Sequence, residues 1–312
     1  MKTLFAALAG FALSYSRLAA AVGLIALALP CSSGLADEAA VTAQLETLGG
    51  TVVAKDGAVI EVSFRDSSRL ADTEWRAIGR LQQLQKLTVY GGARGLNDET
   101  VGYLATLRNL ESLSTDGAQL SDEGLAKLAN ITSLRSAAFF HLSFRKEGFT
   151  GKGFAAWKKL PNLERLTVAG MSMGDEGFAA IAQLQTLQEL RTWHTYRTEA
   201  SHEEIARLSK LTSLKLGQRL PRSGVPPCLT DQSLTTLVKI QTLESLEIGE
   251  ARFTLEALKQ LRNLPHLKRL KIDRTEIAAA DIDALRTELP GVKVEFEPLT
   301  EEQRPKLEAY LK

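Results

Sequence analysis

Hydrophobic positions recur along this chain in a fixed grid, with a period of about 24 residues. One copy of the grid contains Leu160, Leu163, Leu166 and Val168, and the next copy starts at Leu184. Within each copy the apolar residues first alternate with polar ones, which is typical of a short strand. They then follow at intervals of three and four, which is typical of a helix. A strand and a helix repeated at a fixed period predict a solenoid.

The first buried residue of each predicted strand, here called the strand start, recurs ten times. The strand starts are Val62, Leu87, Leu113, Ala137, Leu166, Leu190, Leu214, Leu246, Leu270 and Val292. Parallel strands stack about 4.8 Å apart, whereas helices are about 10 Å wide, so such a stack bends with its strands on the inner side. The sequence therefore predicts an α/β solenoid: a horseshoe of about ten strand-helix rungs with a parallel concave sheet and polar end caps.

A polar signal marks the start of the helix in several rungs. It reads Ser-Asp-Glu-Gly-Leu from Ser121 and Thr-Asp-Gln-Ser-Leu from Thr230. A Ser or Thr cap satisfies free backbone N–H groups, and acids in the first turn suit the positive end of the helix. Because these acids recur at one repeat position, we interpret them as caps and not as catalytic or metal-binding groups.

The leucine grid combined with this Thr/Ser-Asp-x-Gly-Leu signal resembles the leucine-rich repeat family, over residues 60–296. It is most similar to exported bacterial members of the planctomycete kind, and the repeats of eukaryotic F-box adaptors are also similar. The resemblance implies a binding scaffold and does not identify a ligand. Three core positions depart from the pattern, because Ala137 is small and Thr115 and Thr192 replace aliphatic residues.

The ends of the chain differ from the repeats. Residues 1–36 combine two basic residues, an apolar run over 18–29 and small residues up to Ala36, which predicts a signal peptide cleaved after Ala36. The apolar run is shorter than the roughly 20 residues that span a bilayer. We therefore predict an exported protein (periplasmic, envelope or secreted) without a membrane span. A lipid anchor on Cys31 is the alternative, although Pro30 departs from the usual lipoprotein signal.

Polar caps are expected at both ends of the stack. Residues 37–59 predict an N-terminal cap made of an amphipathic helix and a hairpin strand, with the turn at Asp56-Gly57. The solenoid then extends over residues 60–296. Residues 297–312 predict a C-terminal capping helix, in which the position of Pro305 leaves the helix boundary open.

Composition and motifs favour binding over catalysis. Loss of Lys2 and Arg17 with the signal peptide takes the formal net charge from +1 to −1, which gives no bulk attraction for nucleic acid or anionic membranes. The chain has no phosphate loop, nucleophile elbow, zinc-protease motif or calcium loop. We predict no enzymatic activity and no cofactor. Cys228 is expected to be an unpaired thiol in a loop.

The best candidate surface comes from reading across the rungs. Three residues after each strand start, side chains should face the concave side, and this concave column reads Tyr90, Asp116, Phe140, Ala169, Trp193, Gly217, Gly249 and Asp273. Tyr90, Phe140 and Trp193 stand on alternate rungs and are candidate binding anchors. Alternatively, these rings pack on one another or under loops. A slip of one residue would exchange Phe140 with its neighbour Phe139.

Charged residues and insertions adjoin the aromatic residues. Arg191 and Lys215 flank Trp193, and the insertions at residues 141–152 and 218–229 emerge on one rim. The second insertion adds Arg219 and Arg222, so the partner is expected to carry acidic groups, although ordinary solvated charges and loop drift explain these features equally well.

Two histidines lie on the same rim. His141 and His194 occupy the same repeat position two rungs apart. We predict that they contact the ligand. A shared metal is the alternative, but no third ligand is evident, so no metal site is predicted.

Together these features predict an exported binding module that holds a protein or peptide on its concave face and the adjoining loop rim. One alternative is a glycan-binding protein, whose spaced aromatic residues stack on sugar rings. Another is a purely structural component of the cell envelope.

Overall fold

The computed structural model describes residues 32–144 and 148–312. Within these residues eleven strands form one sheet, and each strand lies beside the strands that precede and follow it in sequence. The first two strands, β1 (Thr51–Lys55) and β2 (Ala58–Phe64), pair antiparallel. The later strands are parallel to β2 and are β3 (Lys86–Val89), β4 (Ser112–Asp116), β5 (Ser136–Phe140), β6 (Arg165–Ala169), β7 (Glu189–Trp193), β8 (Ser213–Leu216), β9 (Ser245–Gly249), β10 (Arg269–Thr275) and β11 (Lys293–Pro298).

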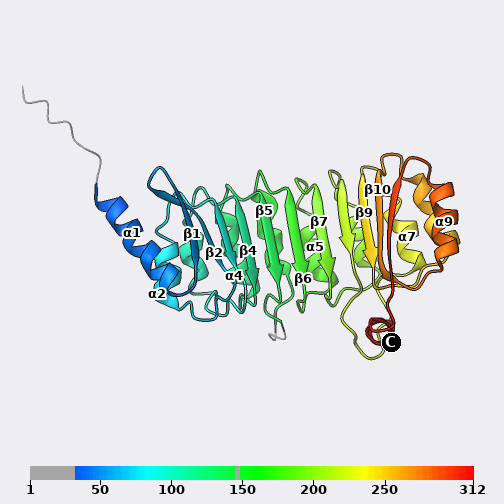
Figure 1. Ribbon diagram of the computed structural model, residues 1–312, viewed down its shortest axis with the longest axis horizontal. Coiled ribbons are helices and arrows are strands. Elements are labelled where there is room, and N and C mark those ends of the chain that lie inside the picture. Colours follow the sequence, from blue (N-terminus) through cyan, green and yellow to red (C-terminus); the bar gives the residue numbers. More distant parts are fainter. Residues whose placement is uncertain (1–31, 145–147) are drawn as a thin grey trace, which may run out of the picture.

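The helices that connect the strands lie on one face of the sheet and leave its other face open (Figure 1). In order they are α2 (Asp72–Ile78), α3 (Val101–Leu104), α4 (Asp122–Lys127), η1 (Leu128–Asn130), η2 (Lys152–Lys159), α5 (Asp175–Ile181), α6 (Ser201–Ile205), α7 (Asp231–Leu237), α8 (Leu255–Lys259), η3 (Gln260–Asn263) and α9 (Ala279–Glu288). Two further helices, α1 (Ser32–Thr47) and α10 (Arg304–Leu311), lie at the chain ends. The predicted α/β solenoid with a parallel sheet is confirmed.

The leucine grid forms the core between the sheet and the helices. The strand starts from Val62 to Leu270 pair with one another in the predicted register, and all are buried. The prediction for the last rung is wrong, because Leu270 pairs with Val294 and not with Val292. Residues 290–292 are used to turn from α9 into β11, with Gly291 at a φ of 85°.

The three departures from the repeat pattern are all buried in this core. In the rung that carries the small Ala137, the buried side chains of Phe139, Phe154 and Trp157 form an aromatic cluster, with ring centroids 5.2 to 6.2 Å apart. Thr115 and Thr192 are fully buried, and their hydroxyl groups have no hydrogen-bond partner. The two hydroxyl groups are therefore local costs to stability.

The recurrent acid at the helix start has a wider role than capping its own helix. The Asp175 carboxylate accepts hydrogen bonds from the backbone N–H and the hydroxyl of Thr198, one rung further on, at 2.8 and 2.7 Å. Asp231 binds Thr254 in the same way, at 2.9 and 2.8 Å. Asp122 does so with Thr150 at 3.1 and 2.8 Å. These acids tie each rung to the next one.

The N-terminal end of the stack is covered by α1 and the β1–β2 hairpin. Val41 and Leu45 of α1 are buried, and the hairpin turns at Asp56 and Gly57, both with positive φ. Helix α1 begins upstream of the predicted cleavage after Ala36, whereas the apolar run of the predicted leader and Cys31 lie outside the described residues. Among the described residues, no helix has the length and apolar character to cross a membrane.

The C-terminal end differs from the prediction. A helix forms at Arg304–Leu311, but it does not cover the end of the stack, where β11 is the edge strand. Figure 1 shows it (dark red) beside the lower edge of the sheet. It forms ion pairs with Arg252, which follows β9, and with Glu276, which follows β10. The edge is instead protected by the charged side chains of Lys293, Glu295 and Glu297.

Candidate binding surface

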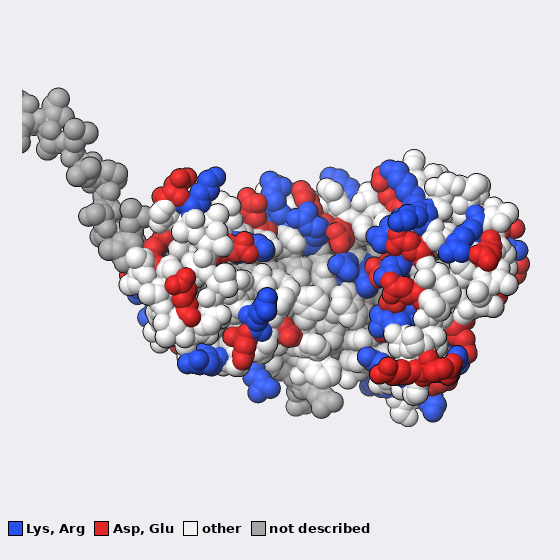
Figure 2. Space-filling view, in the orientation of Figure 1, with Lys and Arg blue, Asp and Glu red and all other residues white. Residues whose placement is uncertain are grey.

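Tyr90, Phe140 and Trp193, here called the aromatic row, lie on the concave side of the sheet. Phe139 is fully buried and Phe140 is half-buried, so the predicted register holds at this pair. Tyr90 is 38% exposed, and Trp193 is half-buried. Figure 2 shows this face as a hollow of mostly uncharged residues, with charged residues at its borders and over the C-terminal third.

The three rings contact one another. The Tyr90 and Phe140 centroids are 5.9 Å apart with an interplanar angle of 81°, and those of Phe140 and Trp193 are 6.1 Å apart at 53°. The rings lean together across the intervening rungs, which carry Asp116 and Ala169. The rings therefore pack on one another, as the alternative interpretation expects, and they still line the concave surface; their role as binding anchors stays a prediction.

Each end of the aromatic row has a hollow. At the Tyr90 end, a hollow of about 510 Å³ is lined by Arg65, Tyr90, Gly91, Asp116, Phe140 and His141. At the Trp193 end, a smaller one of about 150 Å³ is lined by residues that include Trp193, Gly217, Glu250 and Arg274. Apolar rings beside polar rims are the usual composition of a recognition surface.

The cations beside Trp193 are already paired. Lys215 Nζ lies 5.2 Å from the Trp193 ring centroid, and it also forms an ion pair of 2.6 Å with Glu247. The Arg191 guanidinium lies 6.0 Å from the same ring and 4.0 Å from Glu189. These two residues cover Trp193 but add little net positive charge, so they give limited support to the prediction of an acidic partner.

The two arginines of the second insertion have different environments. Arg222 is exposed, as expected for a surface residue. Arg219 is only 1% exposed, and its guanidinium donates to the carbonyls of Val225 and Pro226 at 2.8 and 3.3 Å. Burial lowers the pKa of Arg219. The prediction that Arg219 attracts a partner is wrong, because this residue organises the loop from inside. Cys228 of the same loop is also buried, which raises the pKa of its thiol.

The two rim histidines bind separate carboxylates. His141 Nδ1 is 2.8 Å from Asp116 Oδ1, and His194 Nε2 is 2.9 Å from Glu250 Oε2. This geometry gives no support to a metal shared by both rings. Within the part of the chain that the structure describes, no three His, Cys, Asp or Glu side chains form a group suited to a metal ion.

The residue that follows the concave column adopts a left-handed backbone conformation in most rungs. Gly91, Gly117 and Gly170 occupy this position with positive φ, as glycine does without strain. Four other rungs place larger residues there, each with φ between 48° and 59°: His141, His194, Glu250 and Arg274. Such strain costs of the order of 1–3 kcal/mol per residue and is concentrated at functional sites.

Glu250 and Arg274 were not identified from the sequence. The signal available was the glycine at the same repeat position in other rungs, which marks a backbone that disfavours side chains. His194, Glu250 and Arg274, here called the rim cluster, come together at the ends of β7, β9 and β10. The Glu250 carboxylate receives His194 on one oxygen and Arg274 Nη1 on the other, at 2.9 and 2.8 Å.

Glu250 remains charged in this setting. Its side chain is only 5% exposed, and burial alone would raise its pKa. The hydrogen bond from His194 and the positive charge of Arg274 outweigh that effect, so the pKa of Glu250 is lowered. Within the rim cluster, Glu250 is thus a buried carboxylate held by two partners, His194 and Arg274.

Gly217 lies between the aromatic row and the rim cluster. A Cβ atom at this glycine would be 2.7 Å from Trp193 Cβ and 3.1 Å from Glu250 Oε2. Both contacts are closer than ordinary van der Waals distances, so the two surfaces approach each other only because residue 217 has no side chain.

Comparisons with known proteins give matches to solved structures but none to family models or curated proteins. No protein-family model matches the chain, and no curated protein matches it. Solved structures that are similar include internalin C2 of Listeria monocytogenes, with 16% identity and a TM-score of 0.47 over 85% of this chain and 93% of that chain. Internalin F of the same organism has 17% identity and a TM-score of 0.43 over 87% of this chain and 92% of that chain. At these low identities the similarity concerns the fold alone.

Proposed function

We propose that this chain is a binding protein that holds a protein or peptide partner on its concave face, along the aromatic row. The observation that carries the proposal is the continuous line of three partly exposed rings across five adjacent strands, β3 to β7. Aromatic residues bury large areas at low cost in side-chain entropy and are enriched at the centres of protein interfaces. Export of the protein is the localisation that residues 1–36 favour.

The ring geometry favours a peptide over a glycan. A sugar ring stacks on an open aromatic face, but adjacent rings in the row are steeply inclined to each other. Lys215 and Arg191 already lie against the Trp193 ring. Apolar side chains of a partner can instead enter the hollows between and beside the rings. We assign no reaction to this surface.

The test is capture of a partner from native envelope and secreted extracts. The baits are the wild-type chain and the triple variant Tyr90→Ala/Phe140→Ala/Trp193→Ala. We expect the variant to lose the partner that the wild type retains, with an affinity reduced by about 30-fold or more, because truncation of even one central aromatic residue can cost about 2 kcal/mol. The affinity is then measured by titration calorimetry with the purified partner.

A matched control removes an aromatic ring from the helix face. Tyr103 of α3 is half-buried and binds Arg76 and Asp72 far from the concave side, so Tyr103→Ala should capture the partner as the wild type does. Circular dichroism should show equal folding of all baits. Equal capture by wild type and triple variant would exclude the aromatic row as the site, and capture of a polysaccharide would replace the peptide with a glycan.

A further inference from the structure

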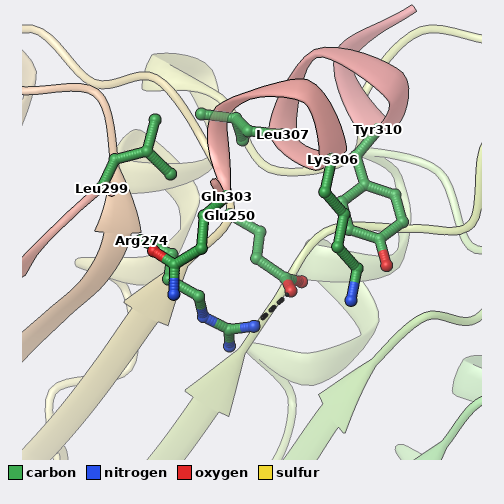
Figure 3. A pocket seen from close by; sticks show the side chains of 7 residues that line it. All are labelled: Glu250, Arg274, Leu299, Gln303, Lys306, Leu307 and Tyr310. Atoms are coloured by element: carbon green, nitrogen blue, oxygen red, sulfur yellow. Dashed lines mark hydrogen bonds and ion pairs between the residues drawn. The ribbon is translucent and has the colours of Figure 1, made fainter. Parts of the chain in front are cut away.

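The C-terminal arm, residues 299–312, returns over the ends of the strands and lies on the rim. Arg304 binds Glu276 after β10 at 2.7 Å, Glu308 binds Arg252 after β9, and the Tyr310 ring lies on His194 after β7 with centroids 4.9 Å apart. The arm therefore crosses the rungs in reverse order. Figure 3 shows α10 over Glu250 and Arg274, with the Tyr310 side chain on the same side.

The arm is held by few strong contacts. Within α10 only Leu307 is buried. The side chains that form the ion pairs of Arg304 and Glu308 are each about half exposed. Exposed ion pairs contribute roughly 0–1 kcal/mol each. A cavity of about 130 Å³ remains between the arm and the residues Glu250 and Arg274. An eight-residue helix is not stable on its own, so the arm should open at a small fraction of the global unfolding free energy.

The surface beneath the arm consists of residues with strained backbone conformations. The arm covers the rim cluster, whose three residues all have left-handed backbone conformations. The cavity under the arm and the hollow beside Trp193 share Glu250 and Arg274 as lining residues. A partner that follows the aromatic row to Trp193 therefore reaches the place that the arm occupies.

We propose that the arm is a displaceable occupant of a second recognition site, and that this site accepts a segment presenting an aromatic ring to His194 and a carboxylate to Arg252. The identity of the natural occupant rests on the proposed function, because the partner that binds the aromatic row would supply this segment when it displaces the arm. The existence of the site can be tested separately, with a peptide that has the sequence of the arm.

The probe is a fluorescein-labelled peptide of residues 299–312, titrated into the full chain and followed by fluorescence anisotropy. In the wild type the attached arm competes at an effective concentration in the millimolar range. The variant Glu308→Ala/Tyr310→Ala removes the contacts of the attached arm with Arg252 and His194 and leaves the rim residues unchanged. We expect it to bind the peptide at least tenfold more tightly than the wild type does.

A charge exchange gives the specific control. Adding Arg252→Glu to that variant should abolish binding of the peptide, and a peptide carrying Glu308→Arg should restore it. The matched change Arg262→Glu, on the helix face where Arg262 lies 3.6 Å from Glu288, should leave binding unchanged. Equal affinity of wild type and variant for the peptide, or no binding to either, would overturn the proposal. Neither result would affect the aromatic row, which is tested by partner capture.

Discussion

At the scale of single residues, the described part of the chain contains both costly and useful hydroxyl groups. Thr192 and Thr230 are chemically identical, but the Thr192 hydroxyl is buried without a partner. The Thr230 hydroxyl accepts the Gln232 backbone N–H at 3.2 Å and donates to Glu199 at 3.2 Å. The same substitution should therefore have opposite effects at the two sites.

We expect Thr192→Val to stabilise the protein by about 1 kcal/mol, because it removes an unsatisfied polar group and keeps the shape of the side chain. Thr230→Val should destabilise it by about 1 kcal/mol through loss of the helix cap. Urea unfolding followed by circular dichroism measures both. A loss of stability in Thr192→Val would mean that its hydroxyl has a partner, such as a buried water.

Prediction from sequence succeeded where side chains alternate and failed where they do not. Tyr90 and Trp193 were placed on the concave side because the alternation of a strand leaves two choices, and the neighbouring leucines select one. Arg219 lies in an insertion that no other rung repeats, so nothing in the sequence indicated that its guanidinium turns inward to the loop carbonyls. Glu250 was missed because its position is defined by backbone conformation and not by polarity.

At the scale of elements, the helix starts are linked from rung to rung. Asp175 receives two hydrogen bonds from Thr198, whereas its neighbour Glu176 forms an exposed ion pair with Lys152 at 2.8 Å. The two acids are adjacent in the same first turn and have similar favourable interactions with the helix dipole. They differ in whether they hold the next rung.

Asp175→Ala should destabilise the protein by about 2–3 kcal/mol, because it leaves a backbone N–H and a hydroxyl without their charged acceptor. Glu176→Ala should cost under about 1 kcal/mol. Hydrogen exchange should locate the change, with faster exchange at Thr198 in the first variant only. Equal destabilisation by both substitutions would show that these acids act through the helix dipole alone.

The position of α10 illustrates what repeat analysis cannot give. The sequence indicated a polar helix after the last strand, and a solenoid needs end caps, so the end of the stack was the expected place. The actual position depends on Tyr310 meeting His194 and Glu308 meeting Arg252, residues 116 and 56 positions away in the chain. Single contacts at such separations leave no periodic signal in a sequence.

At the scale of the whole molecule, stability should depend on pH through a buried histidine. His202 is fully buried in α6, where Arg197 Nη1 lies 3.0 Å from its Nε2 and Glu199 Oε1 lies 3.4 Å from its Nδ1. Burial is the main cause that lowers the pKa of His202 from its ordinary value of 6.5. Below pH 6.5 the unfolded chain therefore binds a proton that the folded chain resists.

The contribution of His202 should thus be complete above pH 6.5 and decrease as the pH falls, at up to about 1.4 kcal/mol per pH unit. Carboxylates with a lowered pKa, such as Glu250, lose their contribution only from about pH 4.5 downwards. Thermal unfolding between pH 7 and pH 5 should show a smaller decrease in Tm for His202→Gln than for the wild type. The exposed His266 provides the control, since His266→Gln should behave as the wild type does; an identical decrease in all three would contradict the role of His202.

Gly217 has a consequence for how the two surfaces communicate. A Cβ atom at this position would meet both Trp193 Cβ and Glu250 Oε2, so any larger residue would have to displace one of them, and the proposed sites of the partner and of the arm both depend on residues at this point. Thermodynamic linkage then requires reciprocity. If a bound partner lowers the affinity of the site for the arm by some factor, release of the arm raises the affinity for the partner by the same factor. The absence of a side chain at residue 217 thus places the two proposed recognition sites close enough for binding at one to influence binding at the other.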